Sequence, residues 1–160
     1  EGARWARRWL HRAPINVASI SVFEQAFGFQ RAIVEALGRG DVTGAREWRL
    51  RAGQFAGFMR QESFRVCPYT LDAALVASYV YARAPTPSPA GWHRTRGRRK
   101  SKTEVRRSWL LDVKIASIAV VQAFPVLTAN AGDFQEIAKL LPSEWTLQVL
   151  RFPEEAPEAP

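Results

Sequence analysis

Apolar and polar positions follow two periods along the chain, one typical of helices and one typical of short buried strands. Strands are predicted where short apolar runs occur, at residues 15–20, 63–68, 124–129 and 145–152. Helices are predicted around and between them, at residues 1–14, 21–37, 44–61, 71–84, 108–123 and 134–141. This alternation of elements predicts an α/β fold, specifically a three-layer α/β/α sandwich with a mainly parallel sheet.

Two segments depart from the alternating pattern. Residues 85–107 are rich in Pro and then in basic residues, with almost no apolar side chains, so we expect a long basic loop there. Residues 153–160, with the sequence PEEAPEAP, are predicted to be a disordered tail. A chain of 160 residues suits one domain with a real core, which we expect over residues 1–152.

The composition narrows the class of protein. The single cysteine, Cys67, excludes an internal disulfide and a cysteine-based zinc site, and it fits a reducing, cytoplasmic compartment. The longest apolar stretch, residues 110–127, is interrupted by Asp112, Lys114 and Pro125, so no membrane span is expected. We also find no pattern typical of a signal peptide at the start of the sequence.

Positive charge is concentrated in one part of the chain. The formal net charge is +8, and eight basic residues lie within residues 94–107, opposed only by Glu104. Charge of this density favours a polyanionic partner, most often nucleic acid, although a solvated loop is the alternative. The residues predicted to contact nucleic acid are Arg94, Arg96, Arg98, Arg99, Lys100, Lys102, Arg106 and Arg107.

Two carboxylates follow predicted strands, and each has an ordinary structural alternative. Ser21 and Glu24 match the S-x-x-E capping box, and Asp133 with Glu136 resembles an N-cap with its reciprocal acid. Capping does not explain Asp112, which heads a face of small apolar residues in the predicted helix 108–123. A partly buried acid there requires a compensating partner.

The strand-to-helix turns of a parallel sheet lie at one edge, where ligands bind. We expect all three acids to lie near helix starts at this edge, where Glu24, Asp112 and Asp133 could converge. Oxygen ligands alone favour Mg²⁺ or Mn²⁺. Such a cation activates water and clamps a phosphodiester for in-line attack.

Two segments resemble PIN-domain ribonucleases, most closely the VapC-like toxins of toxin–antitoxin pairs. ISVFEQAFGFQRAI resembles the family's strand and helix with an acid four residues before a Gly, here Glu24 and Gly28. LLDVKIASIAVVQAFPVLTANAGDF is similar to its acid, Ile-Ala helix, strand and T-x-N-x-x-D-F end. The matched positions in that second segment are Asp112, Thr128, Asn130, Asp133 and Phe134.

The resemblance covers residues 15–150 and implies a single PIN-like domain with Mg²⁺- or Mn²⁺-dependent endoribonuclease activity. It implies that Glu24, Asp112 and Asp133 are the catalytic metal carboxylates, with Thr128 and Asn130 as supporting polar groups. The candidate partners are RNA, an antitoxin protein and a second copy of this chain. No interaction with a membrane is expected.

One family feature is missing from the sequence. Family members open with a strand that ends in Asp and continues with Thr or Ser, and neither Asp41 nor Asp72 replaces that acid. A truncated sequence, a strand supplied by another chain and a degenerate member all remain open. The alternative functions are a catalytically degenerate PIN-like module that binds RNA or a protein through the basic loop, and a different metal nuclease or phosphatase.

Overall fold

A computed structural model describes residues 14–87, 94–95, 98–99 and 101–152. The chain divides into two compact units, with the boundary between Cys67 and Pro68. We call the described residues 14–67 the N-terminal unit and those from 68 to 152 the C-terminal unit, and each is described by itself. The predicted disordered tail, and the predicted first helix apart from Pro14, lie outside the described residues.

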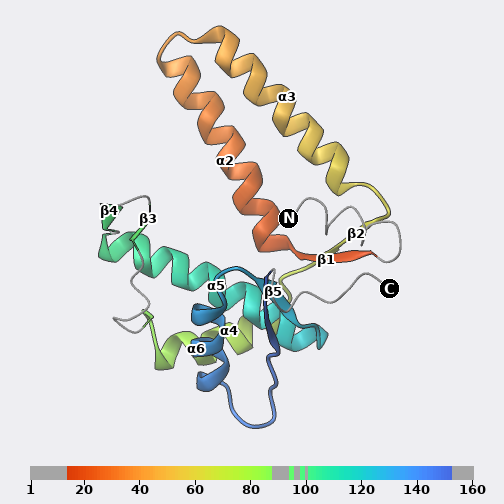
Figure 1. The fold of residues 1–160 in the computed structure, drawn as a ribbon, viewed down its shortest axis with the longest axis vertical. Coiled ribbons are helices and arrows are strands. Elements are labelled where there is room, and N and C mark those ends of the chain that lie inside the picture. The colour runs from red at the N-terminus through yellow and green to blue at the C-terminus, as the bar shows by residue number, and fades with distance from the viewer. Residues whose placement is uncertain (1–13, 88–93, 96–97, 100, 153–160) are drawn as a thin grey trace. The chain divides into compact units, whose positions relative to one another are not determined.

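The N-terminal unit is a parallel strand pair connected by a helical hairpin (Figure 1). Strand β1 pairs with β2 from Ile15 opposite Phe64 to Ala18 opposite Cys67. Its elements in chain order are β1 (Ile15–Ala18), α2 (Ser19–Gly38), α3 (Val42–Met59) and β2 (Phe64–Cys67).

The turn between α2 and α3 follows from residues 36–44. The backbone N–H of Gly40 donates to Leu37 and that of Asp41 donates to Ala36, which is the Schellman pattern that ends a helix. Gly40 takes a φ of +73°, which glycine adopts without steric cost. The Asp41 side chain then accepts from the backbone N–H of Gly44 at 2.8 Å and caps α3.

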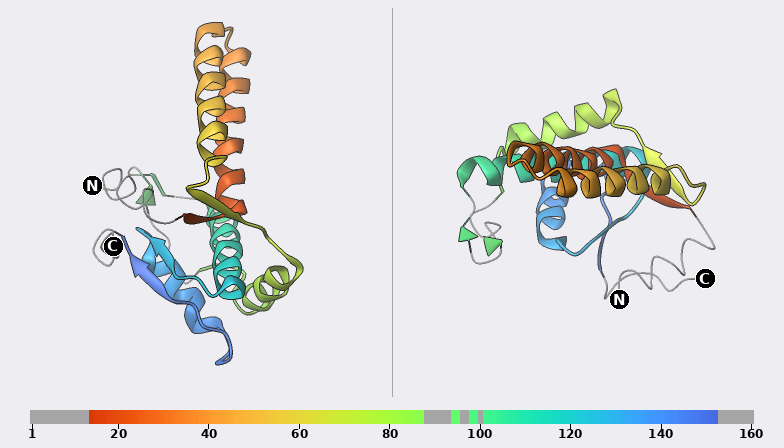
Figure 2. Two further views of the ribbon diagram at one scale, coloured as in Figure 1. Left: turned by 90° about the vertical axis from the view of Figure 1, so that its right-hand side faces the viewer. Right: turned by 90° about the horizontal axis from the view of Figure 1, so that it is seen from above.

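The two helices of this hairpin lie side by side in opposite directions (Figures 1 and 2). The Phe29 ring of α2 contacts two rings of α3, those of Trp48 and Phe55, at centroid distances of 6.3 and 5.6 Å. Ile33 is buried on the same face of α2. Spacings of three and four residues bring these side chains onto one face, as expected for a packed helix.

The C-terminal unit contains two helices followed by a parallel βαβ unit. Strand β5 pairs with β6 from Val126 opposite Val149 to Thr128 opposite Arg151, and α6 makes the crossover. The elements in chain order are α4 (Leu71–Arg83), β3 (Arg94–Thr95), β4 (Arg98–Arg99), α5 (Lys102–Gln122), β5 (Val126–Thr128), α6 (Ala131–Leu140) and β6 (Val149–Arg151). The short strands β3 and β4 pair in the antiparallel direction.

The core of this unit forms where α4, α5, α6 and the strands meet. Val80, Val113 and Ile137 are each at most 1% exposed and belong to the same buried cluster. The indole N–H of Trp109, itself 1% exposed, donates to the carbonyl oxygen of Ala84 at 2.6 Å. This bond fixes α5 to the end of α4 while keeping the polar edge of the indole satisfied.

These elements confirm the predicted α/β class, and β1–β2 and β5–β6 are parallel pairs whereas β3–β4 is antiparallel. In the part of the chain that the structure describes, the strands pair two by two, and no hydrogen-bonded ladder joins them into one sheet. The three-layer sandwich therefore stays a prediction. None of the helices in the described residues has the length and hydropathy needed to cross a membrane.

The predicted loop over residues 85–107 was wrong at its C-terminal end. Helix α5 begins at Lys102 rather than Ser108, because Ser101 and Glu104 form a full capping box. The Ser101 N–H donates to the Glu104 carboxylate at 2.7 Å, and the Glu104 N–H donates to the Ser101 hydroxyl at 3.2 Å. Two backbone N–H groups at the start of α5 thereby gain hydrogen-bond acceptors, although the surrounding sequence is strongly basic.

Candidate acidic site and basic helix

The T-x-N-x-x-D sequence forms a connected polar turn between β5 and α6. Thr128 is the last residue of β5, and its hydroxyl accepts a hydrogen bond from the backbone N–H of Asn130 at 3.0 Å. The Asn130 side-chain amide then donates to a carboxylate oxygen of Asp133 at 2.7 Å. These two hydrogen bonds connect the end of β5 to Asn130, and Asn130 to Asp133 in the first turn of α6.

Asp133 does not have the N-cap position that was the structural alternative for it. Asn130 occupies the N-cap of α6, and Asp133 is the third residue of the helix. Its side chain is buried, with only 9% of the residue exposed. The Asn130 amide donates to this carboxylate, and the first turn of a helix is a favourable position for an acidic side chain.

Asp112 lies in the middle of α5, so its predicted place near a helix start was wrong. The error has the same cause as the missed start of α5, which begins at Lys102 and not at the predicted Ser108. Asp112 is half-buried and stands one turn before Ala116, a residue of the core cluster that also contains Phe134. Helix α5 packs against α6, so both acids are next to residues of one core.

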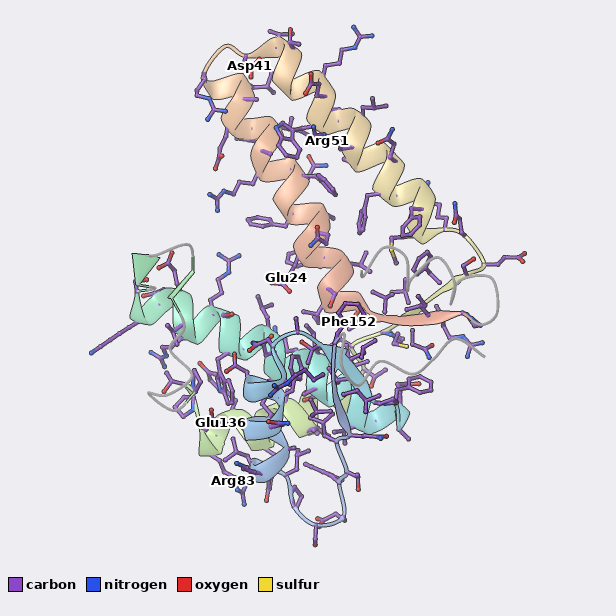
Figure 3. All side chains as sticks on the ribbon, in the orientation of Figure 1. Glu24, Asp41, Arg51, Arg83, Glu136 and Phe152 are labelled. Carbon is purple, nitrogen blue, oxygen red and sulfur yellow. The ribbon has the colours of Figure 1, made fainter. Side chains whose placement is uncertain are left out.

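Glu24 belongs to the N-terminal unit and is exposed on α2 (Figure 3). The predicted capping box of Ser21 and Glu24 was wrong. Helix α2 begins at Ser19, with Ala18 at the N-cap and no side-chain cap, so Ser21 and Glu24 are its third and sixth residues. The structural alternative for Glu24 is therefore removed, and its predicted metal role stays a prediction.

Among the described residues, no three His, Cys, Asp or Glu side chains gather in a group that could hold a metal ion. The C-terminal unit supplies the carboxylates of Asp112 and Asp133 with the amide of Asn130 beside the latter. The two carboxylates offer oxygen ligands, and Mg²⁺ is commonly bound through one or two carboxylates together with waters and substrate phosphates. In number and chemistry, the carboxylates of Asp112 and Asp133 match what this mode of binding uses.

The basic residues that were predicted to contact nucleic acid lie in different elements of the C-terminal unit. Arg94 is in β3, Arg98 and Arg99 form β4, and Arg96 and Lys100 lie outside the described residues. Lys102, Arg106 and Arg107 are exposed in the first two turns of α5, whereas Val105 and Trp109 in the same turns are buried. We call Lys102, Arg106 and Arg107 the basic helix start.

The basic helix start has a defined electrostatic character. The first turn of a helix carries a partial positive charge, and basic side chains placed there add to it. Lys102 and Arg106 are four residues apart and therefore lie on the same face of α5. The carboxylate of Glu104 accepts a hydrogen bond from the Ser101 N–H in the capping box. This surface suits a phosphate backbone better than it suits another cation.

The bond between Asn130 and Asp133 was not predicted from the sequence. Its signal was the N-x-x-D spacing, because a polar residue just before a helix faces the third residue of that helix. The Ser101-x-x-Glu104 signal was missed in the same way, hidden within the basic run. Comparisons with protein-family models, with curated proteins and with solved structures find no match to this chain.

Proposed function

We propose that this chain is a metal-dependent endoribonuclease of PIN type, built on the three-layer sandwich of that family. The observation that carries the proposal is the turn from β5 to α6, where Thr128, Asn130 and a buried Asp133 are linked by bonds of 3.0 and 2.7 Å. A buried carboxylate in the first turn of a helix is costly unless it is hydrogen-bonded or paired, and the Asn130 amide supplies one such bond. The T-x-N-x-x-D-F resemblance supports a metal-binding use.

In this proposal the protein groups have separate roles. Asp133 and Asp112 would hold Mg²⁺ or Mn²⁺, and Asn130 keeps the Asp133 carboxylate in one orientation through its 2.7 Å bond. When bound, the cation lowers the pKa of a coordinated water and neutralises charge on the phosphodiester. The basic helix start contacts backbone phosphates and holds the RNA without reading its sequence.

The test is cleavage of a mixed pool of structured RNAs by the full chain, with Mg²⁺, with Mn²⁺ and with a chelator. Asp112→Asn and Asp133→Asn keep side-chain shape but remove a charge. Each should lower cleavage at least about 100-fold, because loss of a ligand should cost at least as much as the roughly 10–100-fold loss typical for residues that support metal ligands. Asp72→Asn, an exposed acid in the first turn of α4, is the matched control and should leave cleavage unchanged. Glu24→Gln tests the third predicted carboxylate in the same assay.

A second candidate function is an RNA-binding module without catalysis. It is favoured by the finding that no group of three metal-binding side chains is present among the described residues. In this case RNA binding would persist in Asp112→Asn and strengthen, because a negative charge is removed, while no metal-dependent cleavage would be detected. Binding and cleavage measured on the same variants therefore separate the two functions.

RNA binding through the basic helix start makes a quantitative prediction for either function. Each phosphate neutralised contributes about −0.7 to the slope of log affinity against log salt for a single strand. Replacing Lys102, Arg106 and Arg107 by Gln should reduce the magnitude of this slope by about 2. The control replaces Arg46, Arg49 and Arg60, which are exposed on or just after α3, and should leave the slope nearly unchanged.

An antitoxin partner follows from the resemblance to VapC-like toxins alone. If one exists, it should bind the full chain and block cleavage when added in equal amount. Co-purification with the product of a neighbouring gene, followed by the same cleavage assay, tests this part of the proposal separately.

A further inference from the structure

Arg151 is the last residue of β6, and the strand pairing places it beside the end of β5. In the register of this pair, Arg151 lies opposite Thr128. The backbone N–H of Phe152 donates to the carbonyl oxygen of Thr128 at 2.9 Å, which holds the two strand ends together. Residues directly opposite each other in neighbouring strands have their side chains on the same face of a sheet. Arg151 therefore shares a face with the Thr128 hydroxyl, which accepts a hydrogen bond from Asn130.

Asp133 lies at the same edge of this strand pair. Helix α6 connects β5 to β6 and packs against both strands (Figure 2). In such a crossover the helix runs opposite to the strands, so its first turn lies at the edge where the strands end. Asp133 is in that first turn. The fold thus brings Arg151 to the β5–α6 turn, although the two are far apart in the sequence.

The other described cations of the C-terminal unit have other positions. The charged groups of Arg83 and Lys114 lie over tyrosine rings. Lys139 is in the last turn of α6, at the opposite end from the β5–α6 turn. The remaining basic residues belong to β3, β4 and the basic helix start. Among the described residues of this unit, Arg151 is therefore the cation that the strand pairing assigns to the edge with the acid.

We propose that Arg151 binds a backbone phosphate of RNA beside the β5–α6 turn. This inference rests on the proposed function, because it names a protein group that holds the substrate at that site. The carboxylate of Asp133 repels a phosphate, so a site with acids needs positive charge to hold RNA. The Arg151 side chain is exposed at the strand end, and a guanidinium donates two parallel hydrogen bonds to phosphate oxygens.

The first measurement is the rate of RNA cleavage by the full chain at saturating RNA. A fixed donor that stabilises charge in the transition state contributes about 100- to 1,000-fold to kcat, so Arg151→Gln should lower kcat by about 100-fold or more. Arg151→Lys should fall between the two, because an ammonium keeps the charge but not the planar pair of donors. Arg65→Gln is the matched control and should leave kcat unchanged, since Arg65 is an exposed strand arginine in the N-terminal unit.

The affinity for Mn²⁺ without RNA separates phosphate binding from a structural role of Arg151. Removing a positive charge near a carboxylate does not disfavour a cation there. Arg151→Gln should therefore bind Mn²⁺ at least as tightly as the unchanged chain while cleaving RNA more slowly. Weaker binding of Mn²⁺ in this variant would show that Arg151 supports the acids and would overturn its assignment to phosphate.

NMR of the arginine side chains tests the phosphate contact whether or not the chain cuts RNA. In the full chain with Mg²⁺, the Nε–Hε signal of Arg151 is assigned by its loss in Arg151→Gln. It should shift when a short single-stranded oligouridylate is added, and the signal of Arg65 should not. A chain that cuts no RNA but shows this shift would refute the proposed hydrolysis and support the phosphate contact. An unshifted Arg151 signal would overturn the inference, and cleavage by Arg151→Gln equal to that of the unchanged chain would overturn it while leaving the proposed nuclease in place.

Discussion

The bond between Asn130 and Asp133 makes a prediction that can be worked through in free energy. The donor and acceptor atoms are 2.7 Å apart, and Asp133 is buried at the start of α6. Asn130→Ala removes the donor and leaves the carboxylate without this partner. Asp133→Ala removes both the bond and the favourable interaction of the charge with the helix end. The double variant isolates the coupling between the two side chains.

The magnitude follows from the chemistry of the bond. A hydrogen bond to a charged group contributes about 1.5–3 kcal/mol, and a negative charge in the first turn contributes about 0.3–1 kcal/mol more. Asn130→Ala should therefore cost about 2 kcal/mol and Asp133→Ala about 2–4 kcal/mol. Each single variant loses the hydrogen bond, and the double variant loses the same bond only once. The coupling energy should therefore be about 2 kcal/mol, the contribution of that bond.

The assay is urea unfolding without divalent cations, with hydrogen exchange of α6 peptides assigning the change to the C-terminal unit. Gln135→Ala combined with Asp133→Ala is the control cycle, because residues two apart on a helix do not face each other. That cycle should give a coupling near zero. A coupling below about 0.5 kcal/mol between Asn130 and Asp133 would refute the bond as the element that positions the carboxylate.

Three further predictions concern helix ends and an ion pair. Ser101→Ala removes half of the capping box with Glu104, so it should cost about 1 kcal/mol and speed hydrogen exchange in the first turn of α5. Ala123→Gly should raise the unfolding free energy by about 1 kcal/mol in urea titration, because Ala123 ends α5 with a φ of +52° that glycine adopts without strain; a loss of stability would contradict this. The hydrogen bond from Arg31 lowers the pKa of the exposed Glu35. The pair therefore stabilises α2 when the pH is above the usual pKa of Glu, and this stabilisation is lost as the pH falls through the lowered pKa. An NMR titration should find the pKa of Glu35 returned toward its ordinary value in Arg31→Gln, and an unchanged pKa would argue against the pair.

Most helices and strands could be predicted because their signals are local. The apolar runs before Ala18, Cys67 and Thr128 are short and end in turn or cap residues, and each forms the strand expected of it. The pairing of β1 with β2 and of β5 with β6 joins residues more than twenty positions apart. Period and composition carry little information about such pairing, so the sequence indicated parallel strands without indicating which pairs would form.

The candidate site could be predicted in part. Thr128, Asn130 and Asp133 are close together because they are close in sequence. The resemblance to the T-x-N-x-x-D-F pattern singled out these three residues, but their hydrogen bonds were not predicted. Asp112 was identified by an argument that placed the start of α5 incorrectly, because a run of basic residues was taken for a loop although it contains a capping box. Glu24 is at the opposite end of the sequence from these acids, and no local pattern relates it to them.

The most direct test of a metal-dependent nuclease is the chemistry of the ends it produces. One end-labelled RNA, incubated with the full chain and Mg²⁺, should be cut internally without forming 2′,3′-cyclic phosphate, because water is then the nucleophile. The cuts should disappear with chelator and in Asp133→Asn, and persist in Asp72→Asn. Cyclic phosphate ends, or cutting equal in Asp133→Asn and in the unchanged chain, would contradict a role for the β5–α6 turn in hydrolysis.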